Sequence, residues 1–189
     1  MSEQQQPAAW RQIARRIRVP LGFLFAGIYF WIARPTAHSL AASLLLVLPG
    51  LALRAAASGH VKKNEELTTT GPYAYTRNPL YLGSMLIAFG FALASRSWAV
   101  AAALAVLFAI IYMPTILSEE EFLRARFAAF DDYARRVPRL LPYRWPRVDS
   151  GSARGSFSWV LYRAHREYNA SLGTLLLYFA LIVRMALHR

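Results

Sequence analysis

The sequence predicts an all-α integral membrane protein, a helical bundle of about five transmembrane helices, and three observations support this fold class. The 189-residue chain is 56% hydrophobic, which is too apolar for an ordinary soluble domain of this length. Long charge-free runs recur along it. Lys and Arg are concentrated in segments that would all lie on one side of a membrane.

The five predicted spans follow the charge-free runs at 19–33, 35–53, 80–95, 97–117 and roughly 170–183. Each run has about 14 to 21 residues, near the length of about 20 that a spanning helix needs. Arg54, Arg96 and Arg184 stand at run ends, where a long side chain can carry its charge to the headgroups. Aromatic residues near the run ends fit an interfacial belt, namely Trp31, Trp98, Trp159 and Tyr168.

The distribution of basic residues predicts the orientation. Four arginines between residues 11 and 18, then Lys62, Lys63 and Arg77, and ten arginines from Arg124 to Arg166 fall on one side. The other side holds little beyond Arg34, Arg96 and Arg189. The positive-inside rule therefore places the N-terminus in the cytosol, in the cell inner membrane or an equivalent one, and leaves the C-terminus outside.

Charge and composition also exclude some classes of protein. The formal net charge is +12, but next to long apolar runs a basic excess marks membrane flanks, so we expect no nucleic-acid partner. The chain has no cysteine, which removes disulfides, thiolate metal sites and a cysteine nucleophile. The four histidines are scattered over different loops, so we expect no metal site.

The first polar segment of interest is LTTTGPYAYTRNPLYLG, residues 67–83. Gly71-Pro72 is a turn signal, and Asn78-Pro79 predicts a bend that opens the third spanning helix with proline in its first turn. Unpaired N–H groups at such a helix start suit a carboxylate or a ribose of a ligand. A plain capped loop between two helices explains the same residues.

The second segment is SEEEFLRARFAAFDDYARRVPRLLP, residues 118–142, which we expect to continue the fourth span as an amphipathic helix. One interpretation pairs Glu120 with Arg124 four residues on, as a solvated surface pair. In the other, Glu119 and Glu120 point back into the bundle and hold a cation or a hydroxyl-rich ligand.

Together the two segments resemble the isoprenylcysteine carboxyl methyltransferase and phospholipid methyltransferase family. The pattern GPYxYxRxPxYLG precedes an apolar hairpin. After the hairpin come EExxL, a phenylalanine, a tyrosine and VPRxLP, and the resemblance covers residues 62–145. Members of this family are integral membrane enzymes that use S-adenosylmethionine. The resemblance implies a methyltransferase with the same cofactor, and the distribution of basic residues places its site at the cytosolic membrane face.

The resemblance also implies the residues of the site. The cofactor-binding residues would be Gly71, Pro72, Tyr73, Asn78, Pro79, Tyr81, Leu82, Glu119 and Glu120, with residues 137–142 as a cover. Arg77 and Arg139 are candidates to neutralise a substrate carboxylate or phosphate, and each could instead be a headgroup anchor. Glu119, Glu120 and Tyr133 are the candidate proton acceptors for a neutral acceptor.

The sequence departs from the family pattern at two positions. Asn78 stands where histidine is usual, and an asparagine cannot exchange a proton near neutral pH. Ala128 replaces a common glycine, which puts the turn there in doubt. Without a base at position 78, a carboxylate acceptor is favoured over an amine or a hydroxyl.

We therefore predict methyl transfer to a lipid-like or isoprenoid acceptor, either a lipophilic small molecule or a prenylated molecule that enters from the bilayer. An NADPH-dependent relative of the sterol reductases and a non-catalytic membrane scaffold or small transporter are the alternatives. We expect a single membrane domain, 1–189, divided into a basic amphipathic segment (1–18), two spans (19–57), a methyltransferase-like core (62–147) and a final part (148–189). That last part comprises a linker, a basic helix and the fifth span.

Overall fold

The computed structural model describes residues 26–62, 66–143 and 156–187, and this part of the chain forms helices and no strands. The elements are α2 (Ala37–Ser58), η1 (Gly71–Ala74), α3 (Pro79–Ser95), α4 (Trp98–Leu107), η2 (Phe108–Tyr112), α5 (Met113–Arg126), α6 (Phe130–Arg136), α7 (Trp159–Ala164) and α8 (Tyr168–Leu187). A helical stretch at 26–32 precedes α2. The predicted all-α fold is confirmed.

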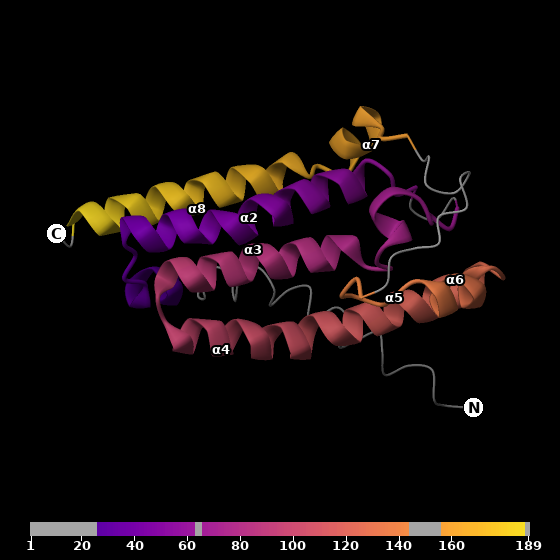
Figure 1. Ribbon diagram of the computed structural model, residues 1–189, viewed down its shortest axis with the longest axis horizontal. Helices are drawn as coiled ribbons and strands as arrows, with labels where there is room; N and C mark the ends of the chain where they lie inside the picture. Colours follow the sequence, from indigo (N-terminus) through magenta and orange to yellow (C-terminus); the bar gives the residue numbers. More distant parts are fainter. Residues whose placement is uncertain (1–25, 63–65, 144–155, 188–189) are drawn as a thin grey trace, which may run out of the picture.

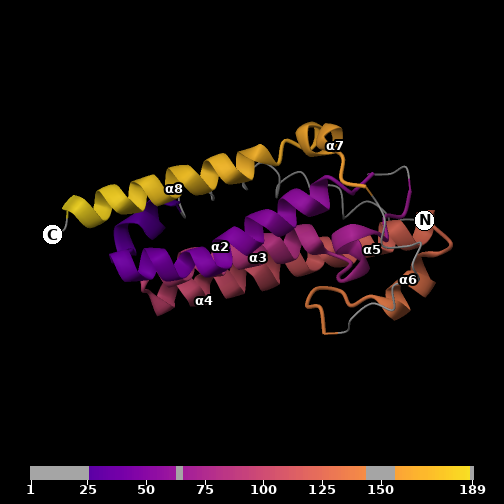
Figure 2. The same ribbon diagram turned by 45° about the horizontal axis from the view of Figure 1, so that its top comes forward.

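The long helices lie side by side, with α3 between α2 and the helix formed by α4 and α5 (Figures 1 and 2). Among the described residues, three helices are long and apolar enough to cross a membrane: Ala37–Ser58, Trp98–Arg126 and Tyr168–Leu187. Pro79–Ser95 is a shorter apolar helix. These four helices coincide, to within two residues at their starts, with the predicted runs at 35–53, 80–95, 97–117 and 170–183, and together they support an integral membrane protein.

The first predicted run, 19–33, is described only from residue 26 onward, and the basic segment 1–18 lies outside the described residues.

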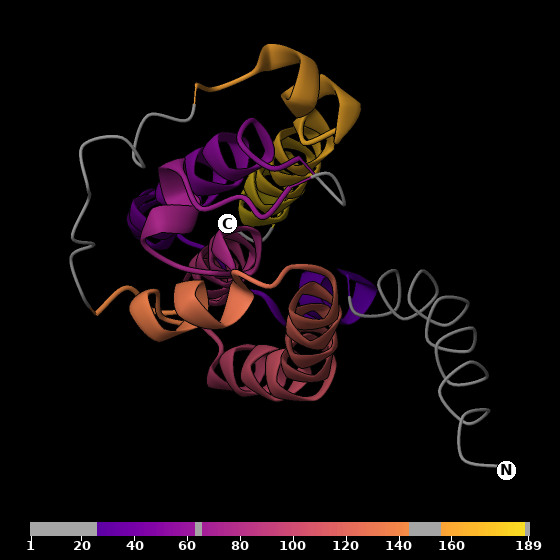
Figure 3. The same cartoon turned by 90° about the vertical axis from the view of Figure 1, so that its right-hand side faces the viewer.

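The bundle has two distinct ends. We call the end with the start of α3 and the end of α5 the Glu120 end, and the opposite one the Trp31 end. Figure 3 looks along the bundle from the Glu120 end and shows α3 at its centre.

Small residues allow α2 and α3 to pack closely. A Cβ added at Gly83 would lie 2.8 Å from the carbonyl oxygen of Gly50, and one at Gly90 would collide with a side-chain carbon of Val47. Backbones come this close in membrane helices only where a side chain is absent. The two glycines of α3 therefore determine how near its polar start lies to α2.

The helix from Trp98 to Arg126 contains one π-helical turn, Phe108–Tyr112, in its middle. Pro114 lies two residues after it, within the first turn of α5. Proline has no N–H and crowds the preceding turn, and a wider turn relieves both effects without ending the helix. This turn also brings the Tyr112 ring to 5.6 Å from the ring of Tyr81.

The amphipathic segment after the fourth span differs from the expected single helix. α5 ends at Arg126, the chain turns over the next residues, and α6 begins at Phe130. Among the described residues, Arg96 and Arg166 are the non-glycine positions with positive φ, so Ala128 forms this turn without a left-handed backbone. Phe130, Tyr133 and Val137 then form a small core of their own.

Candidate functional site

The carboxylate of Glu120 is the centre of a buried charged cluster at the Glu120 end. The residue lies in the middle of α5 and is only 4% exposed. Arg139 donates from Nε to both carboxylate oxygens at 3.1 Å, and its Nη2 lies 3.0 Å from Oε2. Nη1 of Arg77 lies 3.2 Å from the same Oε2. Two cations therefore surround one anion, which leaves the cluster with an excess positive charge.

Asn78 joins this cluster through its side chain. It precedes the first residue of α3, yet its side chain makes no capping bond to that helix. Its Nδ2 donates instead to Oε1 of Glu120 at 3.3 Å and to the carbonyl oxygen of Arg139 at 2.9 Å. The amide therefore links the start of α3 to α5 and to the segment after α6, as a hydrogen-bond donor.

The segment 137–142 is held against the start of α3. The backbone N–H of Arg77 donates to the carbonyl oxygen of Pro138 at 2.9 Å, and Thr76 donates from its hydroxyl to the Arg139 carbonyl at 3.3 Å. This contact brings Arg139 to Glu120. Nε of Arg77 is buried and has no hydrogen-bond partner among the described residues, so it is a donor available to a bound ligand.

A second carboxylate, that of Glu119, lies on the exposed side of α5. The Tyr81 hydroxyl donates to it at 2.8 Å, and the Tyr112 ring supports Tyr81 edge-on. Glu119 and Glu120 thus have different environments, the first open to solvent and the second enclosed.

The turn at Gly71–Ala74 forms a further wall of the site. Gly71 has φ +58°, and a Cβ there would lie 2.5 Å from the ring of His60, so both the backbone and the space favour glycine. The Tyr133 hydroxyl donates to the carbonyl oxygen of Tyr73 at 2.7 Å and fixes α6 to this turn.

Both tyrosines are held in the neutral form. Burial raises the pKa of the Tyr133 phenol, and the neighbouring Tyr73 adds to this effect while Arg77 opposes it. Burial likewise raises the pKa of Tyr73, and the negative charges of Glu119 and Glu167 raise it further. The phenols are therefore hydrogen-bond donors across the ordinary pH range.

Two residues near the site were missed by the sequence analysis. Arg54 of α2 forms a bidentate pair with Glu167, which precedes α8, with three N···O distances of 2.9 to 3.1 Å. The two side chains are 22% and 12% exposed. Arg54 also donates to the Ser84 hydroxyl on α3. The start of the C-terminal helix is thereby tied to α2 and, through Arg54, to α3.

The structure brings most of the expected site residues to one end of the bundle. Glu120, Arg77, Arg139 and Asn78 form the cluster, and Pro79 and Leu82 are buried in the first turn of α3. The alternative pairing of Glu120 with Arg124 is not found, because Arg124 pairs with Asp131 at 2.8 Å.

Comparison with known proteins matches residues 51–129 to the family model described as phospholipid methyltransferase. The chain is 35% identical over 133 residues to the cobalt-zinc-cadmium resistance protein CzcN of Cupriavidus metallidurans, covering 66% of this chain and 61% of that protein. It is 43% identical over 81 residues to the nickel-cobalt-cadmium resistance protein NccN of Alcaligenes xylosoxydans xylosoxydans, covering 43% of this chain and 38% of that protein.

The chain therefore spans less than two thirds of either relative. No solved structure matches it. The matched residues include the turn at 71–74, the start of α3 and both glutamates, and they end before Tyr133, Arg139 and Glu167. Residues 51–129 thus match the phospholipid methyltransferases, the family that the sequence resemblance predicted.

Proposed function

We propose that the protein transfers a methyl group from S-adenosylmethionine to an anionic, lipid-like or isoprenoid acceptor at the cytosolic membrane face. The observation that carries the proposal is the Glu120 cluster, where two arginines and one carboxylate meet Asn78 at the start of a membrane helix. Its excess positive charge is suited to an acceptor carboxylate or phosphate.

The residues at this end fit the cofactor. The buried Nε of Arg77 needs an acceptor, which a cofactor carboxylate would provide. Glu119 and the turn at 71–74 offer acceptor oxygens for an ammonium group and a ribose, beside the rings of Tyr73 and Tyr81. We propose that Gly71, Pro72, Tyr73, Asn78, Pro79, Tyr81, Leu82, Glu119 and Glu120 hold it. When bound, S-adenosylmethionine supplies an electrophilic methyl group on a sulfonium.

The remaining task of the protein residues is to position the acceptor and exclude water. An acceptor carboxylate is already a nucleophile, so no side chain has to remove a proton. This agrees with a Glu120 that is engaged by two guanidinium groups and with a Tyr133 that stays neutral. Arg77 and Arg139 then orient the acceptor, and Tyr133 positions the turn at 71–74.

Calorimetric titration of the detergent-purified protein with S-adenosylmethionine and S-adenosylhomocysteine tests the cofactor. We expect micromolar binding that Asn78→Ala weakens about tenfold, because one buried hydrogen bond contributes about 1 to 1.5 kcal/mol. Glu121→Ala is the control, since Glu121 is exposed on α5, next to the cluster residue Glu120. Binding of NADPH in place of these ligands would contradict the proposal and favour a reductase.

The orientation is tested on the chain itself, because it has no cysteine. A single cysteine at the exposed Glu121 and another at the exposed Leu187 mark the two ends of the bundle. In intact cells, a membrane-impermeant maleimide should label the Leu187→Cys variant and not the Glu121→Cys variant. Labelling in the reverse pattern would place the site on the outer face.

A further inference from the structure

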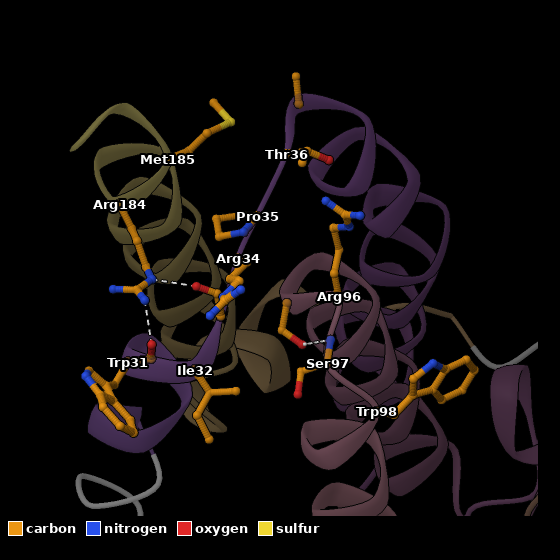
Figure 4. A pocket seen from close by; sticks show the side chains of 13 residues that line it. Trp31, Ile32, Arg34, Pro35, Thr36, Arg96, Ser97, Trp98, Arg184 and Met185 are labelled. Atoms are coloured by element: carbon orange, nitrogen blue, oxygen red, sulfur yellow. Dashed lines mark hydrogen bonds between the residues drawn. The ribbon is translucent and has the colours of Figure 1, made fainter. Parts of the chain in front are cut away.

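A large cavity lies at the Trp31 end, at the far end of the bundle from the proposed site (Figure 4). Its volume is about 1120 Å³, and it lies where the connection after residue 32 meets the α3–α4 turn and the end of α8. Three arginines from these three segments line it: Arg34, Arg96 and Arg184. The proposed function uses none of them.

Among the described residues, no acidic side chain balances the charge of this cavity. None of the residues that line it is acidic. Among the described residues, neither Arg34 nor Arg96 has an ion-pair partner, and the described salt bridges all lie toward the Glu120 end. Like charges that share a cavity repel each other, so a bound anion would relieve this repulsion.

The backbone holds the arginines together. The N–H of Arg34 donates to the carbonyl oxygen of Ser95 at 3.0 Å, which fixes Arg34 beside the α3–α4 turn. Arg96 ends α3 with φ 57°, in the left-handed region that a bulky residue rarely adopts. Arg184 donates to the carbonyl oxygens of Ala33 and Trp31, which places its guanidinium against the same connection.

The rim of the cavity indicates which anion fits. Trp31 and Trp98 are 78% and 90% exposed, and tryptophans in such positions lie at the level of lipid headgroups. Ile32, Pro35 and Met185 provide apolar lining next to the arginines. A phosphate bound here would therefore have hydrocarbon and aromatic surface beside it, which fits a lipid better than a free ion.

We propose that this cavity binds the phosphate of an anionic phospholipid from the leaflet at the Trp31 end. Guanidinium groups bind phosphate oxygens through paired N–H donors, and tryptophan rings accommodate the glycerol and the first acyl carbons. The site is independent of methyl transfer, and it explains why the few cations at this end of the bundle share one cavity.

Native mass spectrometry of the full chain, released from nanodiscs that contain equal phosphatidylglycerol and phosphatidylcholine, measures the preference. The wild type should retain phosphatidylglycerol selectively, and an Arg34→Gln/Arg96→Gln variant should lose about 30-fold in that preference. This factor corresponds to about 1 kcal/mol for each arginine near an anionic headgroup. Arg135→Gln/Arg136→Gln removes the same charge from exposed α6 and should behave as the wild type.

An Arg34→Lys/Arg96→Lys variant tests folding, because it retains the charge and should keep most of the preference. Equal retention of the two lipids by the wild type would overturn the proposal. A glutamine pair that keeps the preference of the wild type would overturn it as well. Stabilisation by inorganic phosphate alone, without selectivity for phosphatidylglycerol, would assign the cavity to a soluble anion and also reject a lipid site.

Discussion

The substitution Glu120→Gln tests the cluster at the start of α3. It keeps the shape of the side chain and removes the negative charge that binds Arg77 and Arg139. An amide also presents a donor where the two guanidinium groups need acceptors. The variant therefore leaves two cations near each other at a position that is 4% exposed in the wild type.

The expected loss is worked from the exposure of the partners. Removing one member of a buried ion pair costs about 3 to 5 kcal/mol. Two features lower this value, because glutamine keeps one acceptor oxygen and because the Arg139 side chain is 42% exposed and can be hydrated. We expect the free energy of unfolding to fall by about 2 to 3 kcal/mol. Glu121→Gln, the same change on an exposed neighbour, should alter it by less than about 0.5 kcal/mol.

Unfolding of the purified protein in mixed micelles, with a rising fraction of a denaturing detergent and helix content followed by circular dichroism, gives both values. A double-mutant cycle with Arg139→Gln isolates the coupling to that arginine. Equal losses for Glu120→Gln and Glu121→Gln would refute the argument that the cluster is a buried, mutually dependent unit.

Three other predictions follow from the same contacts. Arg54→Gln should destabilise the protein by about 2 kcal/mol in the same unfolding assay, and addition of Glu167→Gln should recover part of that loss, since no unpaired charge then remains. Gly83→Ala should cost about 2 kcal/mol or more because its Cβ meets the Gly50 backbone, whereas Gly173→Ala, with nothing within 4 Å, should be neutral or slightly stabilising. Stability should fall as the pH rises above 10, because burial raises the pKa of Tyr133 above its value of 10.0 in an unfolded chain and the unfolded state then loses protons first. Tyr133→Phe should make this fall shallower in an alkaline titration of unfolding.

The helices were predictable because their signals are local. Charge-free runs follow the spans closely, and the Asn78-Pro79 step predicted the start of α3 correctly. Pro79 restricts the backbone to the conformation of a first helical turn, and Gly71 permits the left-handed conformation at φ +58°. Both effects depend on the residue type alone, so the sequence is enough to predict these two positions.

The partners of charged residues were less predictable because they depend on folding over long distances. Arg124, four residues after Glu120, is a possible partner for it. The helix break after Arg126 changes the direction of the chain, however, and Arg124 pairs with Asp131 of α6 instead. Arg139 then takes the place of Arg124 beside Glu120. Arg54 stands at a run end, where anchoring at the headgroups explains it fully, so nothing in the sequence pointed to Glu167.

The separation of Arg54 from its partner has a consequence for how the protein is made. Glu167 follows Arg54 by 113 residues, so Arg54 leaves the ribosome long before Glu167 has been synthesised. During that interval the Ser84 hydroxyl and the Leu80 carbonyl oxygen are the contacts that Arg54 has within the earlier helices. Glu120 differs, because Arg77 and Asn78 are synthesised before it and Arg139 follows after only 19 residues. The cluster around Glu120 can thus be complete while α8 is still being translated, and Glu167 then adds its contact to an α2 that already packs on α3.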